Sequence, residues 1–226
     1  MFMRSCAFGA AMACALMTGG CATESSHTLQ VQQVQAAASP YAGARLPVSI
    51  GKFDNHSSFM RGVFSDGVDR LGGQARSALI AHLQQSQRFA VQDRDNLAEA
   101  GQEAKIKGTT QSLRGASYLI TGDVSEFGRK ETGDEQLFGL LGRGKRQVAY
   151  AKITLNVVDT TTSEVVYSAS GAGEYELSNR EVIGFGGTAG YDATLNGKVV
   201  DLAMREAVDR VAAAKDAGQW GREDRR

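Results

Sequence analysis

The sequence contains little proline, no cysteine after position 21 and no excess of either charge. Two prolines in 226 residues exclude a rigid, proline-rich linker. Because the three cysteines lie within the first 21 residues, the rest of the chain has no disulfide, thiolate zinc site or cysteine nucleophile. The 25 basic and 25 acidic residues cancel, so there is no basic field for nucleic acid and no acidic excess favouring disorder. We therefore expect no nucleic-acid partner, and one domain with a substantial core.

Residues suited to catalysis or cofactor binding are also scarce. The three histidines fall in three separate segments, which favours neither a metal site nor a catalytic triad. A G-x-G-x-x-A pattern begins at Gly184, but Gly190 and the Asn196-Gly197 pair stand where a dinucleotide-binding fold would open its helix. We therefore expect no catalytic, cofactor-binding or metal-binding residue, and no enzyme activity.

The first 20 residues have the pattern of a secretory signal peptide. One arginine precedes a short, alanine-rich apolar run that is too brief to span a bilayer as a helix. The run ends in Thr18-Gly19-Gly20-Cys21, which resembles the lipobox of bacterial lipoproteins, where the cysteine is lipidated and becomes the mature N-terminus. By that resemblance Cys21 is acylated and anchors the chain in a lipid bilayer, and alanine rather than aspartate after it points to the outer membrane. The alternative is an ordinary signal peptide with an incidental cysteine.

The remaining chain divides into a tether, a domain and a tail. Residues 21–46 are rich in Ser, Thr, Gln and Ala without a periodic apolar pattern, which predicts a flexible tether between the lipid and the domain. Residues 47–220 contain the periodic segments and form the predicted domain. Residues 221–226 are charged and are expected to fray.

The segment from Gln147 to Tyr175 carries the clearest pattern in the domain. Its first half alternates between apolar and polar residues, a period typical of a half-buried strand. Residues 159–162 interrupt the alternation as a polar turn, and Val165 to Tyr167 resume a β-favouring run, which predicts an antiparallel hairpin. The predicted buried positions of its first strand are Ala149, Ala151, Ile153, Leu155 and Val157.

Helical and strand signals surround this hairpin. Apolar residues at intervals of three and four predict helices over residues 68–85 and from about 199 to 214, and His82 is expected to be a packed or solvated helix residue. Asp93 or Asp95 is a candidate cap for another helix. Further strands are predicted over residues 47–53, 89–91 and 117–127. These patterns predict an α/β (α+β) fold, with a mixed sheet, a central antiparallel hairpin and flanking helices.

The order of these elements resembles the CsgG/HfaB family, outer-membrane lipoproteins related to the curli secretion channel. The resemblance begins at Val48-Ser49-Ile50 and continues through ALIAHLQQSQRF, SLRGASYLITGDV, AKITLNVVDTTTSEVV and the closing GKVVDLAMREAV ahead of Trp220. It implies a lipid-anchored domain that faces the periplasm, assembles as a homo-oligomer, and has an exported or envelope protein as its partner.

Rings of this family place two β-hairpins of each protomer in a shared outer-membrane barrel, so the resemblance implies hairpin insertions at residues 125–150 and 170–195. A barrel strand needs about 9–11 alternating residues with an apolar lipid face, whereas residues 128–147 are rich in charge. Two functions therefore stay open. One is a ring-forming component of protein secretion, which exports or anchors extracellular fibre or adhesin subunits. The other is a non-pore periplasmic accessory lipoprotein that binds a partner protein at the envelope.

Two segments are candidate sites. The family channel narrows at a loop with an aromatic residue, an asparagine four residues on and an aromatic five residues on. Phe59, Val63 and Phe64 have that spacing, with valine in place of asparagine, and are candidates for a pore constriction or an interface. Packing on the neighbouring sheet or subunit is the alternative. The glycine-rich stretch 181–191 would expose the large side chains of a candidate membrane or assembly segment, namely Ile183, Phe185 and Tyr191.

Overall fold

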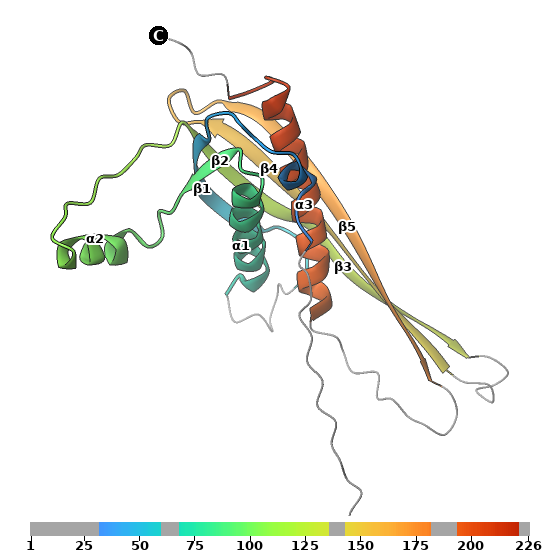
Figure 1. The fold of residues 1–226 in the computed structure, drawn as a ribbon. Helices are drawn as coiled ribbons and strands as arrows, with labels where there is room; N and C mark the ends of the chain where they lie inside the picture. The colour runs from blue at the N-terminus through green and yellow to red at the C-terminus, as the bar shows by residue number, and fades with distance from the viewer. Residues whose placement is uncertain (1–31, 60–67, 136–142, 182–193, 222–226) are drawn as a thin grey trace, which may run out of the picture. The chain divides into compact units, whose positions relative to one another are not determined.

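The computed structural model describes residues 32–59, 68–135, 143–181 and 194–221 (Figure 1). In chain order the elements are η1 (Gln35–Ala38), β1 (Leu46–Asn55), α1 (Arg70–Gln85), β2 (Phe89–Gln92), α2 (Leu97–Ile106), β3 (Tyr118–Glu135), β4 (Arg143–Asp159), β5 (Val165–Glu181) and α3 (Thr194–Asp216). The predicted combination of helices and strands is therefore confirmed. β3 continues further than the sequence indicated, to Glu135 instead of residue 127.

The strands form one mixed sheet in the order β2-β1-β3-β4-β5. β1 is parallel to both β2 and β3, whereas β3 with β4 and β4 with β5 are antiparallel. The predicted antiparallel hairpin is confirmed as β4 and β5. It occupies one side of the sheet, because β3 lies in the middle and β5 forms an edge.

One face of the sheet is apolar. The predicted positions of β4 are all buried, and Tyr150, between two of them, is exposed. In β3 a bulge between Val124 and Glu126 shifts the register, so that Phe127 is buried together with Val124. The buried residues of β4 are Ala149, Ala151, Ile153, Leu155 and Val157.

Helices α1 and α3 lie side by side and cover this apolar face (Figure 1). His82 of α1 is buried at 1% exposure, and its Nε2 lies 2.8 Å from Oδ1 of Asp201 on α3. Of the two positions left open for His82, packed or solvated, the structure shows the packed one, and its side chain joins the two helices. The buried stripe of α1 includes Leu71, Ala75, Leu79 and Leu83, and that of α3 includes Val199, Ala203, Ala207, Val211 and Ala214.

Two glycines of β5 allow α3 to approach the strand backbone. A Cβ at Gly171 would lie 2.1 Å from the carbonyl oxygen of Ala203 and 2.4 Å from the nitrogen of Ala207. A Cβ at Gly173 would lie 2.7 Å from the Cβ of Leu202. Because any side chain at these positions would collide with the helix, the close packing of α3 on β5 requires glycine.

Two local features differ from the sequence prediction. The compact unit begins at Gln33, upstream of the expected domain start at residue 47, and Val34 within the predicted tether is 1% exposed. The prediction that Asp93 or Asp95 caps α2 is wrong, because the N-cap residue is Asn96. The Asp93 carboxylate instead accepts a hydrogen bond from the Asn96 side chain, which tightens the turn before the helix.

Candidate functional site

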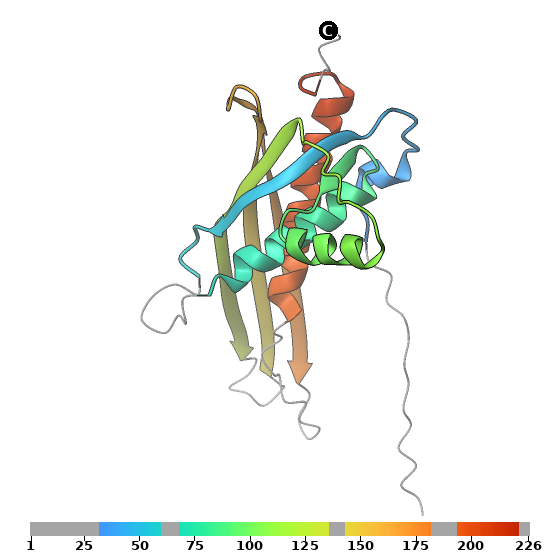
Figure 2. The same cartoon turned by 90° about the vertical axis from the view of Figure 1, so that its left-hand side faces the viewer.

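Strands β3, β4 and β5 run side by side past the rest of the sheet (Figure 2). β1 pairs with β3 only as far as the pair Asn55 and Val124, whereas β3 and β4 stay paired to Glu135 and Arg143. We name residues 126–135, 143–152 and 172–181 the projecting ladder. Its β3–β4 part coincides with the hairpin implied over residues 125–150, whereas residues 182–193 of the second implied hairpin lie outside the described residues.

The projecting ladder has two backbone edges with no strand partner among the residues that the structure describes. One is β3 beyond Val124, and the other is β5. Part of the β5 edge is closed, because the Ala172 N–H donates to Oε2 of Glu206 on α3 at 2.8 Å. This backbone hydrogen bond, together with the nearby Arg210, lowers the pKa of the Glu206 carboxyl. The remaining edge is the kind of surface to which a strand of another chain can add.

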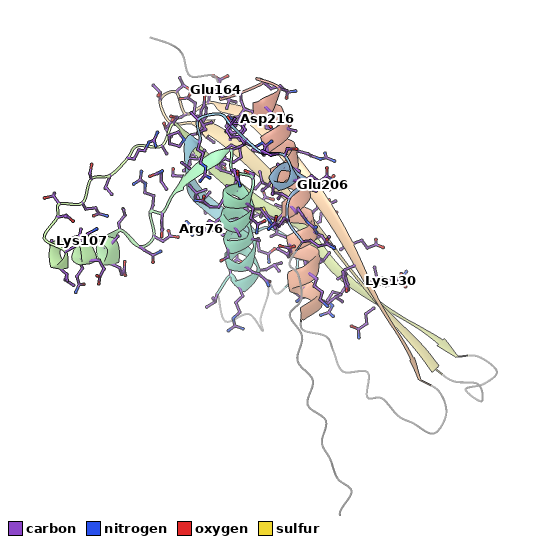
Figure 3. The ribbon with its side chains drawn as sticks, viewed as in Figure 1. Arg76, Lys107, Lys130, Glu164, Glu206 and Asp216 are labelled. Carbon is purple, nitrogen blue, oxygen red and sulfur yellow. The ribbon has the colours of Figure 1, made fainter. Side chains whose placement is uncertain are left out.

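Charged residue types occupy both faces of the projecting ladder. Paired residues of the three strands form rows across the ladder. In one row Arg143 of β4 lies between Glu135 of β3 and Glu181 of β5, and in another the β3 residue is Lys130 and the β5 residue is Glu176. Lys130 lies on the ladder beyond α3 (Figure 3). Successive rows alternate between the two faces, so neither face carries the apolar alternation that a lipid-facing strand needs over about 9–11 residues.

Among the predicted site residues, the described structure places Phe59. Its ring centroid lies 4.4 Å from that of Phe127, so it packs on the sheet where β3 leaves β1. The Asn55 side chain donates to the carbonyl oxygen of Phe59 at 2.9 Å. Val63 and Phe64 lie outside the described residues, as do Cys21, Ile183, Phe185 and Tyr191.

The ends of the Phe59 loop are held by one carboxylate. Asp69 caps α1 by accepting from the N–H of Gly72 at 2.7 Å. Its other oxygen accepts from the N–H of Asn55 at 2.7 Å, at the last residue of β1. The Asp69 carboxylate therefore holds the end of β1 and the start of α1 close together, beside β3.

The N-terminal segment before β1 is clamped by a buried arginine. Arg88 is 5% exposed and lies between α1 and β2. Its Nε donates to Oδ2 of Asp216 at 2.8 Å, and its Nη1 donates to the carbonyl oxygens of Ala36 at 2.6 Å and Ser86 at 2.7 Å. All these bonds involve a charged donor, which makes them stronger than bonds between neutral groups.

Helix α3 supplies the other half of this clamp. Asp209 accepts hydrogen bonds from the backbone N–H groups of Gln35 and Ala36, at 3.1 and 3.0 Å. Lys215 lies 4.6 Å from the ring centroid of Tyr41, and its Nζ donates to the Tyr41 hydroxyl at 2.6 Å. We name residues 33–45 the N-terminal strap. Sequence reasoning missed it because its partners come from distant positions and leave no local pattern.

The histidines form no metal centre in the part of the chain that the structure describes, where no group of three or more His, Cys, Asp or Glu side chains could hold a metal ion. His56 is largely exposed, and its nearest carboxylates, Asp54 and Asp123, are both 3.9 Å away. None of the helices in the described ranges is long and apolar enough to cross a membrane.

The geometry defines a mixed α/β domain with a projecting strand ladder and a clamped N-terminal strap. Residues 28–217 match the family described as the curli production assembly/transport component CsgG. A protein of Neisseria meningitidis serogroup B that is named as a lipoprotein is 60% identical over 208 residues, which cover 92% of this chain and 93% of that protein. This chain belongs to the CsgG family.

Two solved structures that match this chain share little sequence with it and have TM-scores below 0.5. A dodecameric PelC from Paraburkholderia phytofirmans is 17% identical with a TM-score of 0.38, covering 76% of this chain and 92% of that one. A lipoprotein from Neisseria meningitidis is 11% identical with a TM-score of 0.33, covering 76% and 99%.

Proposed function

We propose that this chain is a lipid-anchored outer-membrane protein that assembles with copies of itself into a ring, and that the ring exports or anchors extracellular fibre or adhesin subunits. The domain faces the periplasm, and Cys21 carries the lipid. The family description, which names curli assembly and transport, supports this class of partner. The partner itself is an exported or envelope protein.

One observation carries the ring proposal. Among the described residues, no strand pairs with β3 on its β1 side beyond Val124 or with the outer side of β5, and these two edges lie on opposite sides of the projecting ladder. Two different edges on one chain can pair head to tail, and head-to-tail contacts close into a ring when their rotation allows it. Glu206 limits this pairing, because its bond to Ala172 occupies a donor on the β5 edge.

The N-terminal strap supports an anchoring role for the segment before it. Because the strap is packed on the domain from Val34 onward, the twelve residues between Cys21 and Val34 are left to span the distance to the bilayer. Twelve residues reach about 40 Å at most. The lipid would therefore hold the domain close to the membrane surface.

The charge on the projecting ladder favours the second candidate, a non-pore periplasmic accessory lipoprotein that binds a partner protein at the envelope. Rows containing Glu135, Arg143 and Glu181 would be costly in contact with lipid. In this case the ladder edges receive a strand of the partner protein instead of a second copy.

A size measurement on detergent-extracted protein distinguishes the two candidates. Full-length protein is purified from membranes, and its mass is measured by light scattering and its shape by electron microscopy. The ring proposal expects a large assembly that dissociates on heating. A monomer at every concentration would contradict it and leave the accessory function.

The anchor is tested separately through Cys21. Cys21→Ala should move the protein from the membrane fraction to the soluble fraction, because the sequence between Cys21 and the strap contains no apolar run that could replace the lipid. Cys14→Ala is the matched control and should stay membrane-bound. Full membrane retention of Cys21→Ala would assign the attachment to another part of the chain.

A further inference from the structure

The two outer strands of the projecting ladder carry opposite charges in the same rows. In the row that begins at Lys130 of β3, the β5 residue is Glu176, and both residues are exposed. Four residues closer to the tip, the row that begins at Asp134 of β3 ends at Arg180 of β5, so the signs are reversed. Two such ladders placed edge to edge would bring opposite charges together in both rows, which stabilises a pair of neighbouring strands.

On β5 the outward backbone groups belong to Ala172 and to every second residue after it. The Ala172 N–H is turned away from β4, because it donates to Glu206 of α3. Outward and inward backbone groups alternate along a strand of an antiparallel pair. The N–H and C=O groups of Glu174 and Glu176 therefore also point to the outer side of β5.

On β3 the outward backbone groups belong to the residues that flank Lys130. Ala172 and Lys152 stand opposite each other without exchanging hydrogen bonds, so the backbone groups of Lys152 face β3, where its partner is Glu126. The backbone groups of Glu126, and of every second residue as far as Lys130 and beyond, therefore face β4. Those of the residues between them, such as Glu131, face outward.

These two patterns fit a parallel pair of strands. β3 and β5 run in the same direction, because each is antiparallel to β4. In a parallel pair a residue bonds to the neighbours of its partner, as Leu46 does in this sheet. Leu46 is paired with Phe89, and its N–H donates to the carbonyl oxygen of Arg88 at 3.0 Å. Glu176 placed opposite Lys130 meets the same condition, since the outward groups lie on Glu176 itself and on both neighbours of Lys130.

We propose that β5 of one copy pairs in parallel with β3 of the next copy, in the register that sets Glu176 beside Lys130 of that copy. The inference rests on the proposed ring and names the contact that builds it. In the same register Arg180 lies beside Asp134 of the next copy, so both charged rows are complementary. The contact is head to tail, and it can continue around a closed ring.

Two features limit the length of the paired segment. Glu206 keeps the N–H of Ala172 occupied, so pairing on β5 begins after Ala172. At the tip the row ends in glutamate on both strands, and Glu181 would face the like charge of Glu135. Residues 173–180 of β5 lie between these limits and have the length of an ordinary strand, about 3–10 residues.

An ion pair of the proposed kind is present on the same face of the ladder. Lys152 of β4 and Glu126 of β3 lie opposite each other, with 3.3 Å between Nζ and Oε1. Lys130 follows Glu126 by four residues and is on the same face of β3. A strand added beside β3 would therefore bring Glu176 next to Lys130 as β4 brings Lys152 next to Glu126.

Charge reversal tests the register in the full-length, detergent-extracted protein. Lys130→Glu and Glu176→Lys should each raise the concentration at half-assembly by about tenfold, because like charges then face each other across the contact. The double variant should return that concentration to within about threefold of wild type. Glu164→Lys is the matched control and should leave assembly unchanged, because Glu164 is exposed and lies in the turn between β4 and β5. A double variant as weak as the single variants would overturn the register.

Disulfide cross-linking tests the same contact without relying on charge. Lys130→Cys combined with Glu176→Cys should give a series of covalent oligomers on a non-reducing gel after oxidation, and each single variant only background dimer. A disulfide within one chain is excluded, because Val148 separates the two positions by two strand spacings, about 9–10 Å. The Cα atoms of a disulfide lie within about 7 Å of each other.

The outcomes distinguish this contact from the proposed function. A ring that forms without cross-links in the double cysteine variant would overturn the strand pairing and leave the proposed ring intact. A wild-type protein that stays monomeric at every concentration would overturn both, and would leave the β5 edge to a strand of a partner protein.

Discussion

Arg88 and Asp216 form an ion pair of 2.8 Å that connects the turn after α1 with the last residue of α3. The Arg88 side chain is 7% exposed and that of Asp216 is 36% exposed, so the guanidinium is the buried partner. The same guanidinium also holds the carbonyl oxygen of Ala36 in the N-terminal strap. One arginine therefore links the end of the domain to its beginning.

Arg88→Lys should release the N-terminal strap. Lysine keeps the charge but cannot reach Asp216 and Ala36 at once, because it lacks the planar fork of donors. We expect the unfolding free energy to fall by about 2–4 kcal/mol, since buried hydrogen-bond acceptors lose their donor. Limited proteolysis should cut the strap faster than in wild type. Arg94→Lys is the control, and equal cutting in both variants would show that the α3 contacts of Asp209 and Lys215 hold the strap without Arg88.

Ile153→Asp should prevent folding. Ile153 is fully buried on the helix-covered face of β4, where an unpaired carboxylate costs several kcal/mol, a large part of the total stability. Lys152→Ala, one residue earlier and on the opposite face, should change the unfolding free energy by less than about 1 kcal/mol. Chemical denaturation followed by circular dichroism measures both. Equal stability of the two variants would contradict the assignment of the faces.

The Glu206 carboxylate should make the packing of α3 on β5 depend on pH. The bond from the Ala172 N–H lowers the Glu206 pKa in the folded chain. A lowered pKa in the folded state means that the carboxylate stabilises the fold above the ordinary glutamate pKa. That stability is lost as the pH falls through the lowered value.

Glu206→Gln provides the measurement. The difference in unfolding free energy between wild type and variant should be constant at neutral pH and shrink in the acid range. Since the Glu206 side chain is 41% exposed, solvent screening keeps the difference below about 1 kcal/mol. A difference that grows on acidification would contradict the assigned sign.

Phe185→Ser should weaken assembly or membrane insertion without unfolding the domain. The glycine-rich sequence around Phe185 is costly to order alone, so we expect a neighbouring subunit or the bilayer to cover it. Circular dichroism should be unchanged, while size-exclusion chromatography in detergent should show a smaller species. An unchanged oligomer would contradict the prediction, and a collapsed fold would make Phe185 an ordinary core residue.

The sequence predicted those parts of the fold in which neighbouring residues determine the outcome. Alternation fixed the faces of β4 around Ile153, and helical spacing located α1 and α3, because these patterns reflect burial along a single element. The extension of β3 to Glu135 was implied by the family resemblance alone, since Lys130 and its charged neighbours resemble a loop in the sequence and become a strand only through pairing with β4. The strap around Val34 was missed for a similar reason.

The candidate site also contains one part that the sequence predicted and another part that depends on packing. The spacing of Phe59, Val63 and Phe64 came from a resemblance, but the contact between Phe59 and Phe127 depends on the bulge in β3 and leaves no signal in the sequence. Asn96 occupies the N-cap position of α2 without a capping side-chain bond, and the Asp93 carboxylate accepts from the Asp95 N–H and the Asn96 side chain in the turn before the helix. Only the folded structure shows which of these neighbouring polar residues occupies the N-cap position of α2.

The glycine contacts between β5 and α3 have a mechanical consequence. Ordinary interfaces between a strand and a helix contain side chains that can change rotamer and absorb a small movement. At Gly171 and Gly173 the helix rests directly on the strand backbone, so nothing deformable separates them. A displacement of β5 should therefore pass directly to α3, because no side chain of Gly171 or Gly173 stands between the strand and the helix to absorb it.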